Sequence, residues 1–201
     1  MAIQMAASHA ASKRLKDAIF GASAACRAAI EKHGADRVTN ATIGAVMDDA
    51  GNLAHLPTVE RIFRSLPIED YIAYAPISGL PEHLEAVVDI TFADHRPAGC
   101  LGAIATAGGT GALRLAIANY VEKGEYALTS DWFWGTYGVI CQEHGCALTN
   151  FKLFDEHNQF NHTAFADAVE SLCKVQDSLL IILNTPAHNP TGYSLSAEDW
   201  D

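Results

Sequence analysis

The chain has 201 residues, of which 13 are basic Lys or Arg and 24 are acidic Asp or Glu, so its formal net charge is −11 at pH 7. Hydrophobic residues make up 49% and charged residues 18%, a composition that can bury a sizeable core and excludes a wholly disordered chain. The acidic balance argues against a nucleic acid or an anionic membrane surface as a partner, because the phosphates of either would be repelled.

The first hundred residues are expected to form helices separated by loops. A first helix is predicted over residues 12–33, with Gly34 as its stop. After a loop-rich stretch, a second helix is predicted over residues 57–66. Residues 71–76 are expected to be a short loop, and the next helix has Pro81 in its first turn.

From about residue 101 the pattern changes to strands alternating with helices. This alternation predicts βαβ units and a mainly parallel sheet covered on both faces, so the fold class is α/β. The longest apolar run, residues 179–183, suits a buried strand and is far too short to cross a bilayer. The predicted strands are 101–106, 126–130, 146–151 and 179–184, and the predicted helices are 112–121, 136–144 and 163–174.

The last residues have the pattern of a helix start. Ser196 and Asp199 are spaced like a capping box, and the sequence stops within the first turn of that helix. An isolated first turn has no packing to offset its nucleation cost. The chain is therefore expected to be a fragment of a longer protein.

Cysteine and histidine spacing gives no sign of disulfides or metal. An odd number of scattered cysteines in a chain of this length predicts reduced thiols and a cytoplasmic protein. None of the nine histidines has the spacing of a metal-ligand pair, so no metal site is expected. The five cysteines are Cys26, Cys100, Cys141, Cys146 and Cys173.

A glycine turn, Thr106-Ala-Gly-Gly-Thr-Gly-Ala-Leu113, lies between a predicted strand and a helix. There, glycines can bring backbone N–H groups close to an anion at the positive end of the helix. No lysine follows, so a P-loop is not indicated, and a plain tight connection would fit as well. The Thr110 hydroxyl, a further donor, favours the phosphate-binding interpretation.

Two more loops follow predicted strands, at the edge of an α/β sheet where ligands bind. The loop 131–137 carries three large aromatic side chains within its first six residues, which suit either a local hydrophobic cluster or a ring that stacks on a planar cofactor. In residues 186–192, two prolines and a glycine restrict the backbone, and the Asn189 carboxamide can donate a hydrogen bond to a ring oxygen.

Five segments, in order, resemble the class I aminotransferases, which are pyridoxal-phosphate enzymes of fold type I, and within them the aspartate and aromatic amino-acid branch. The last segment matches the cofactor loop of that family outright. The five segments are Asp17-Ala-Ile-Phe-Gly21, residues 40–51, Tyr74-Ala-Pro-Ile-Ser-Gly-Leu80, Gly108-Gly-Thr-Gly-Ala-Leu113 and His188-Asn-Pro-Thr-Gly192.

The resemblance implies a three-layer α/β/α large domain, truncated here. Residues 1–57 would be the N-terminal arm and small-domain segment, and residues 58–201 the first part of the large cofactor-binding domain. The implied activity is transfer of an amino group between an aspartate-type or aromatic amino acid and a 2-oxo acid, with pyridoxal 5′-phosphate as cofactor. A fold-type-I lyase or synthase and a non-catalytic cofactor-binding sensor domain are the alternatives.

Carried over position by position, the resemblance also implies the cofactor-binding residues. The glycine turn would bind the phosphate. The ring of Trp134, with Trp132 as the alternative, would stack on the pyridine, and Asn189 would hydrogen-bond its phenolic oxygen. The cofactor-binding set is Gly108, Gly109, Thr110, Trp134, Asn189 and Tyr74.

Other implied roles concern the partner subunit and the substrate. Tyr74 would reach the neighbour's cofactor phosphate in a homodimer with shared active sites. Gly44 would lie near the substrate carboxylate, and Ile19 would belong to a lid. The chain departs from the family at Val46 and Met47, which replace a Tyr and an Arg.

The Schiff-base lysine of the family would lie beyond residue 201. Lys174 ends a Ser-x-x-Lys sequence, but it falls on a predicted amphipathic helix and is expected to be solvated. No catalytic residue is therefore assigned within the chain. The six lysines present, none in a matching motif, are Lys13, Lys16, Lys32, Lys123, Lys152 and Lys174.

Overall fold

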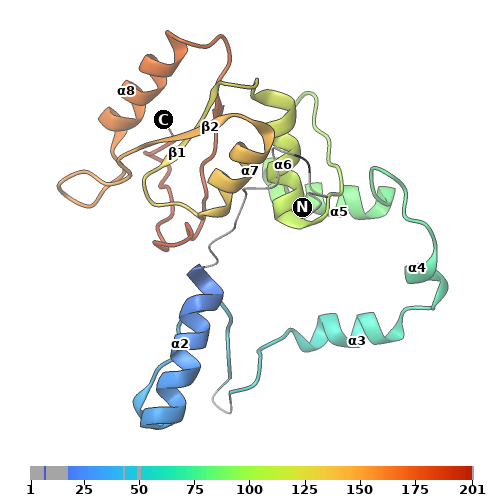
Figure 1. Ribbon diagram of the computed structural model, residues 1–201. Helices are drawn as coiled ribbons and strands as arrows, with labels where there is room; N and C mark the ends of the chain where they lie inside the picture. The colour runs from blue at the N-terminus through green and yellow to red at the C-terminus, as the bar shows by residue number, and fades with distance from the viewer. Residues whose placement is uncertain (1–6, 8–17, 43, 49–50, 201) are drawn as a thin grey trace, which may run out of the picture. The chain divides into compact units, whose positions relative to one another are not determined.

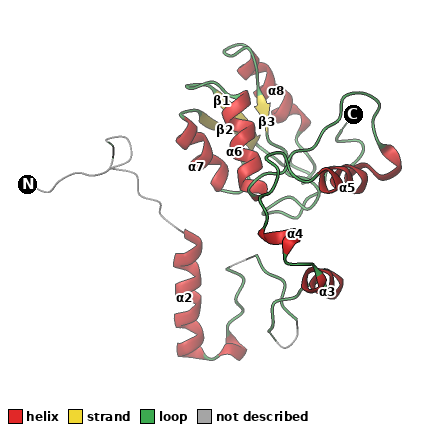
Figure 2. Cartoon of the chain, turned by 90° about the vertical axis from the view of Figure 1, so that its right-hand side faces the viewer, coloured by secondary structure: helices red, strands yellow, loops and turns green. Residues whose placement is uncertain are grey.

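The computed structural model describes residues 7, 18–42, 44–48 and 51–200, with side chains described from residue 21 onward in these ranges and at residue 7. The part of the first predicted helix before residue 18 lies outside the described residues. The chain forms two compact units, residues 1–73 and residues 74–201. Within the described ranges, all strands lie in the second unit (Figure 2).

Helices dominate the described part of the first unit. Helix α2 ends where predicted, because Gly34 adopts a φ of 90° and its N–H bonds the Ile30 carbonyl at 2.8 Å. The predicted second helix is also confirmed, as α3. The elements are α2 (Ala18–His33), the 3₁₀-helix η1 (Ala35–Arg37), α3 (Pro57–Ser65) and α4 (Glu69–Ile72).

Helix α4 corrects the prediction that residues 71–76 form only a loop. The Ile72 N–H donates to the Ile68 carbonyl at 3.2 Å, which closes one helical turn. Glu69 and Asp70 occupy that turn, where negative charge favours a helix N-terminus. The loop therefore begins at Ala73.

Helices and parallel strands alternate in the second unit, as the sequence predicts. Helix α5 begins at Pro81, as expected of proline in a first turn. Strand β1 and helix α7 have the predicted bounds. The elements are α5 (Pro81–Phe92), η2 (Ala93–His95), α6 (Gly108–Tyr120), β1 (Tyr126–Ser130), α7 (Thr136–His144), β2 (Ala147–Phe151), α8 (His162–Cys173) and β3 (Leu180–Ile181).

The three strands form a parallel sheet in the order β2-β1-β3. Tyr126 is opposite Ala147 in the β1–β2 pair, and Ala127 is opposite Leu180 in the β1–β3 pair. A central strand with parallel neighbours on both sides must be covered on both faces, and β1 is accordingly buried from its second residue on.

Each face of the sheet has its own apolar core. Ala127 packs with α6 and α7, whereas Leu128, the next residue, packs on the α8 side, because successive strand residues point to opposite faces. Figure 1 shows α8 on one side of the strands and α6 and α7 on the other. The expected α/β/α layering is thus confirmed within this unit.

Two predicted strands are shorter than expected or absent. Residues 101–106 form no ladder; the Ala105 N–H donates instead to the Ser78 carbonyl at 2.8 Å. Of the predicted strand 179–184, only Leu180–Ile181 pairs with β1, although the Ile182 N–H still bonds the Leu128 carbonyl. A strand needs a neighbour to pair with, and none of the described residues provides one for residues 101–106.

A buried glutamine links β1 to the segment before β3. The Gln176 side chain accepts from the Tyr126 N–H at 3.0 Å and donates to the Tyr126 and Ser178 carbonyls at 2.9 and 2.7 Å. It therefore replaces a strand neighbour at the start of β1. Among the described helices, none combines the length and the apolar character needed to cross a membrane.

Candidate functional site

The glycine turn forms the first turn of α6, which begins at Gly108 and not at Ala112 as predicted. Gly108 has a φ of 68° and donates its N–H to the Thr106 carbonyl at 2.8 Å. The N–H groups of Gly109 and Thr110 have no acceptor among the described residues, as expected at a helix N-terminus. A Cβ built on Gly109 would meet no atom within 4 Å. This turn therefore offers two free amides and the exposed Thr110 hydroxyl to an anion.

The loop after β1 is anchored to the loop after β2 by Asp131. The Asp131 N–H donates to the Phe151 carbonyl at 2.7 Å, and its carboxylate accepts from the Leu153 and Trp132 N–H groups at 2.8 and 3.1 Å. Since both the backbone N–H and the carboxylate of Asp131 are hydrogen-bonded, the loop leaves the sheet in a defined direction.

The three aromatic residues of this loop have different surroundings. Trp134 is half-buried, and its ring meets the Tyr137 ring edge-on at 5.9 Å. The Phe133 ring stacks on the Tyr137 ring, with the two ring centroids 6.3 Å apart. Trp132 is 55% exposed. Trp134 is thus supported by packing and Trp132 is not, while each retains exposed ring surface.

The loop after β3 turns back on itself between His188 and Tyr193. The His188 N–H donates to the Tyr193 carbonyl at 2.7 Å, and the Gly192 N–H donates to the His188 carbonyl at 2.6 Å. The Thr185–Pro186 and Asn189–Pro190 peptide bonds are cis.

His188 joins this loop to the end of β1. Its Nδ1 lies 2.8 Å from the Thr191 hydroxyl oxygen, and its Nε2 lies 3.4 Å from the hydroxyl oxygen of Ser130, the last residue of β1. The Ser130 hydroxyl also donates to the Trp132 carbonyl. Burial lowers the pKa of His188, and a hydrogen bond with the Trp132 backbone raises it by a smaller amount. The net lowering favours a neutral imidazole.

Asn189 has an anchored backbone and a free side chain. Its N–H donates to the Asn184 carboxamide oxygen at 2.6 Å. Its own carboxamide is exposed and has no hydrogen-bond partner among the described residues. The side chain can therefore donate to a ligand without first breaking a protein contact.

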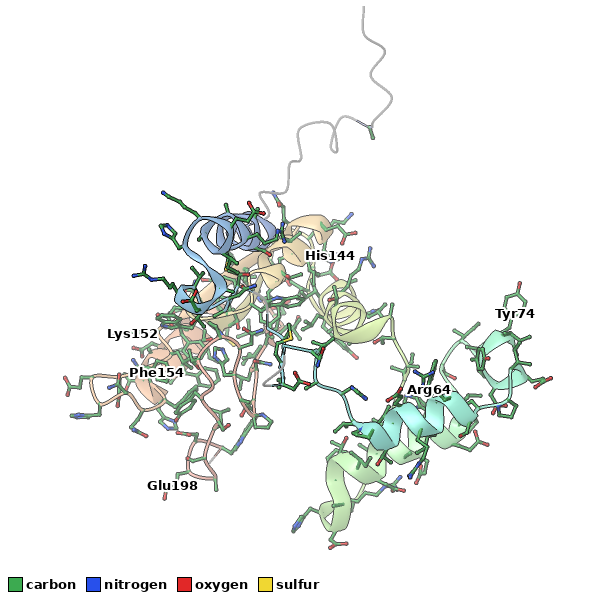
Figure 3. The ribbon with its side chains drawn as sticks, turned by 90° about the horizontal axis from the view of Figure 1, so that it is seen from below. Arg64, Tyr74, His144, Lys152, Phe154 and Glu198 are labelled. Atoms are coloured by element: carbon green, nitrogen blue, oxygen red, sulfur yellow. The ribbon has the colours of Figure 1, made fainter. Side chains whose placement is uncertain are left out.

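The remaining predicted residues lie elsewhere. Tyr74 is fully exposed, and its side chain extends away from the ribbon (Figure 3). Gly44 is an exposed loop residue of the first unit, and Ile19 is in α2, where its side chain lies outside the described residues. Contacts of Ser130 and His188 thus join the Trp132 and Asn189 loops. No hydrogen bond in the described structure links either loop to the first turn of α6.

Sequence reasoning missed Ser130, Asn184 and His188 as contributors to the site. The sequence places His188 in the cofactor-loop motif without giving it a role, and it places Asn184 at the end of a predicted strand. A usable signal was present, because a polar residue at the carboxyl end of a buried parallel strand faces the ligand-binding edge. Across the described ranges, no group of three or more His, Cys, Asp or Glu side chains could hold a metal ion.

Comparison with known proteins is consistent with this arrangement. The family model described as aminotransferase class I and II matches residues 37–201. The aromatic-amino-acid aminotransferase of Paracoccus denitrificans is 27% identical over 164 residues, covering 79% of this chain and 40% of that protein. The mitochondrial aspartate aminotransferase of Xenopus tropicalis is 27% identical over 171 residues, covering 80% of this chain and 39% of that protein.

Solved structures agree with the fold. The crystal structure of an aminotransferase from Anaerococcus prevotii superposes with a TM-score of 0.92 at 35% identity, over 98% of this chain and 48% of that one. An aromatic amino acid aminotransferase from Psychrobacter sp. B6 gives a TM-score of 0.75 at 25% identity, over 94% and 48%. The chain thus spans less than half of the length of these relatives. The family match, which covers most of the chain, together with the parallel sheet and its loops, shows that this chain belongs to the class I and II aminotransferases, a pyridoxal-phosphate-dependent family.

Proposed function

We propose that this chain supplies the phosphate- and ring-binding part of a pyridoxal-phosphate-dependent aminotransferase that moves an amino group between an aspartate-type or aromatic amino acid and a 2-oxo acid. The observation that carries the proposal is the donor set at the carboxyl edge of the sheet, found in a chain of this family. When bound, the cofactor acts as the electron sink of the reaction, and the protein positions it.

The first turn of α6 holds the phosphate. The N–H groups of Gly109 and Thr110 have no protein acceptor, and the positive end of the helix dipole favours a dianion there. The Thr110 hydroxyl adds a donor. Gly108 has a positive φ, which lets the backbone turn into the start of the helix. The donor set therefore fits a phosphate monoester.

Asn189 and Trp134 hold the ring. The free Asn189 carboxamide donates to the ring oxygen, which favours its ionised form. Trp134, packed against Tyr137, stacks on the ring face; the exposed Trp132 is the alternative.

A homodimer completes the site. Tyr74 is fully exposed, makes no hydrogen bond or ring contact with the residues that the structure describes, and carries a hydroxyl donor suited to a phosphate on a second subunit. On the substrate side, Gly44 contributes backbone and Ile19 contributes a lid. The exposed Val46 and Met47 make that surface more apolar than the Tyr and Arg of the aspartate branch would.

The proposal also includes the organisation and location of the protein. Residues 1–57 belong to the arm and small domain, and residues 58–201 to the large domain. The protein is proposed to be an enzyme of amino-acid biosynthesis in the cytoplasm, a location supported by five cysteines that are all free thiols.

Ligand binding tests the proposal on the chain itself. Pyridoxamine 5′-phosphate, which binds without a covalent bond, should quench tryptophan fluorescence and saturate, and pyridoxamine without its phosphate should bind far more weakly. Thr110→Val and Trp134→Leu should weaken binding, while Trp200→Leu, a change at an exposed tryptophan, should not. Equal binding of the two ligands would contradict the phosphate assignment.

Turnover tests the reaction class. The 201-residue chain should release no 2-oxo acid, because none of its lysines lies in a Schiff-base motif. A chain extended to the length of its relatives should convert aspartate or phenylalanine to the corresponding 2-oxo acid. Release of any other product would instead indicate a lyase or synthase.

A further inference from the structure

Asn184 holds the peptide of Asn189 in place from the end of the β3 segment. Its carboxamide oxygen accepts the Asn189 N–H at 2.6 Å, a short hydrogen bond. Asn184 follows residues that are still held by the sheet, because the Ile182 N–H donates to the Leu128 carbonyl of β1 at 2.8 Å. Asn189 is therefore tied by one hydrogen bond to Asn184, which lies two residues along the chain from the sheet-bonded Ile182.

The Asn189 side chain depends on this anchor. The exposed Asn189 carboxamide has no protein partner to hold it, so the backbone that carries it limits where it can reach. The neighbouring anchors hold other peptides: the His188 N–H bonds the Tyr193 carbonyl, and the Ala187 N–H bonds the Ser194 hydroxyl at 2.9 Å. Among the described residues, Asn184 alone bonds the Asn189 N–H.

We propose that Asn184 is a positioning residue, whose carboxamide oxygen fixes the Asn189 peptide so that the Asn189 carboxamide is presented to the cofactor ring oxygen. This inference rests on the proposed function and deepens it. Asn184 makes no contact with the cofactor in this proposal and acts through Asn189.

The anchor is tested first without any ligand. With asparagine labelled by ¹⁵N, the Asn189 amide proton of the wild-type chain should resonate downfield and exchange slowly with water. Asn184→Ala should move it upfield and speed its exchange at least tenfold. Asn184→Asp, which keeps an acceptor oxygen, should restore both properties. Ser194→Ala removes a hydrogen bond from the same loop and should leave the Asn189 signal unchanged.

Binding then tests the consequence. Asn184→Ala should weaken pyridoxamine 5′-phosphate binding about three- to tenfold, the value of one hydrogen bond that is no longer well oriented. An analogue that lacks the ring hydroxyl should bind wild type and Asn184→Ala equally, because Asn189 has nothing to donate to. In the bound ligand, ionisation of the ring hydroxyl should shift to higher pH in Asn184→Ala.

The outcomes separate the two proposals. If wild type fails to bind pyridoxamine 5′-phosphate, the proposed function is wrong and the role of Asn184 falls with it. If wild type binds it but Asn184→Ala binds equally well, only the positioning role is wrong. Equal weakening for the analogue without the hydroxyl would also overturn that role, because Asn184 would then be acting on the loop as a whole.

Discussion

The imidazole Nε2 of His188 lies 3.4 Å from the Ser130 hydroxyl oxygen, and both residues are buried. Ser130 ends the central strand, whereas His188 belongs to the loop that follows the neighbouring strand. Two segments separated by 58 positions thus meet at the edge of the sheet where the Trp132 and Asn189 loops begin. The contact joins the loop proposed to stack on the face of the cofactor ring to the loop proposed to bond the ring oxygen.

The burial of His188 predicts a pH dependence of stability. Burial lowers the pKa of His188 in the folded chain, while in the unfolded chain it returns to its ordinary value of about 6.5. Below pH 6.5 the unfolded state binds the extra proton, so stability is fully present above that pH and falls as the solution is acidified. The urea midpoint of wild type should therefore drop between pH 7.5 and 5.5.

His188→Gln should remove part of this drop, since the residue no longer titrates. The matched control is His83→Gln, a change at an exposed histidine of α5, which should keep the wild-type pH dependence. A wild-type slope in His188→Gln would show that the imidazole is protonated equally in both states.

The buried Gln176 side chain predicts a cost for its removal. Gln176→Leu keeps the volume but leaves the Tyr126 N–H without its acceptor, at the start of the central strand. A buried donor left without a partner costs about 1–3 kcal/mol, so the free energy of unfolding should fall by about 2 kcal/mol. Urea denaturation measures this free energy of unfolding. The control is Gln142→Leu, a substitution at an exposed position of α7. Equal stabilities of the two variants would contradict the linking role.

Local chemistry explains which elements the sequence could predict. Strand β1 and helix α7 were predicted with their observed bounds, because an apolar run and the Gly145 stop mark them directly. The capping-box hydrogen bonds were also correct, although residues 197–199 form a turn and not the expected helix: the Ser196 N–H bonds the Asp199 carboxylate at 2.7 Å, and the Asp199 N–H bonds the Ser196 hydroxyl at 3.2 Å. Each feature is specified within a few residues.

Other features depend on residues far away in the sequence. Residues 101–106 have a strand composition, but pairing needs a neighbour, which no local pattern reveals. The same limit hid the role of His188, because it contacts Ser130, 58 positions away. The residue types at the site were therefore predictable, whereas the contacts that orient them were not.

The five thiols should differ in reactivity. Burial raises the pKa of Cys141 to about 12, and a side-chain hydrogen bond with Cys146, which favours the protonated Cys141 thiol, is the second cause. The Cys141 thiol is then almost wholly protonated at pH 8, and the thiolate is the reactive form. Cys100 and Cys173 are exposed.

A thiol reagent at pH 8 should therefore label Cys100 and Cys173 quickly, and Cys141 and Cys146 only after denaturation. Peptide mass spectrometry of the native and the urea-treated chain would identify the modified sites. Rapid native labelling of Cys141 would show that the end of α7 opens readily.

Adjacent glycines at the start of α6 should respond in opposite directions to the same substitution. Gly108 has a φ of 68°, where a Cβ is strained, so Gly108→Ala should lower the free energy of unfolding by about 1–2 kcal/mol. Gly109 has no positive φ, and its Cβ would meet nothing within 4 Å. Gly109→Ala should therefore leave stability unchanged or raise it by up to about 1 kcal/mol, because alanine favours the helix.

Ligand binding should separate stability from function at Gly109. The new methyl group would stand beside the free N–H groups and keep the phosphate at a distance, so Gly109→Ala should bind pyridoxamine 5′-phosphate more weakly despite its undiminished stability. Affinity for pyridoxamine, which lacks the phosphate, should not change. Thermal denaturation and fluorescence titration of both variants give the two quantities. A Gly109→Ala chain that bound the phosphate ligand as tightly as wild type would place the phosphate elsewhere than at the first turn of α6.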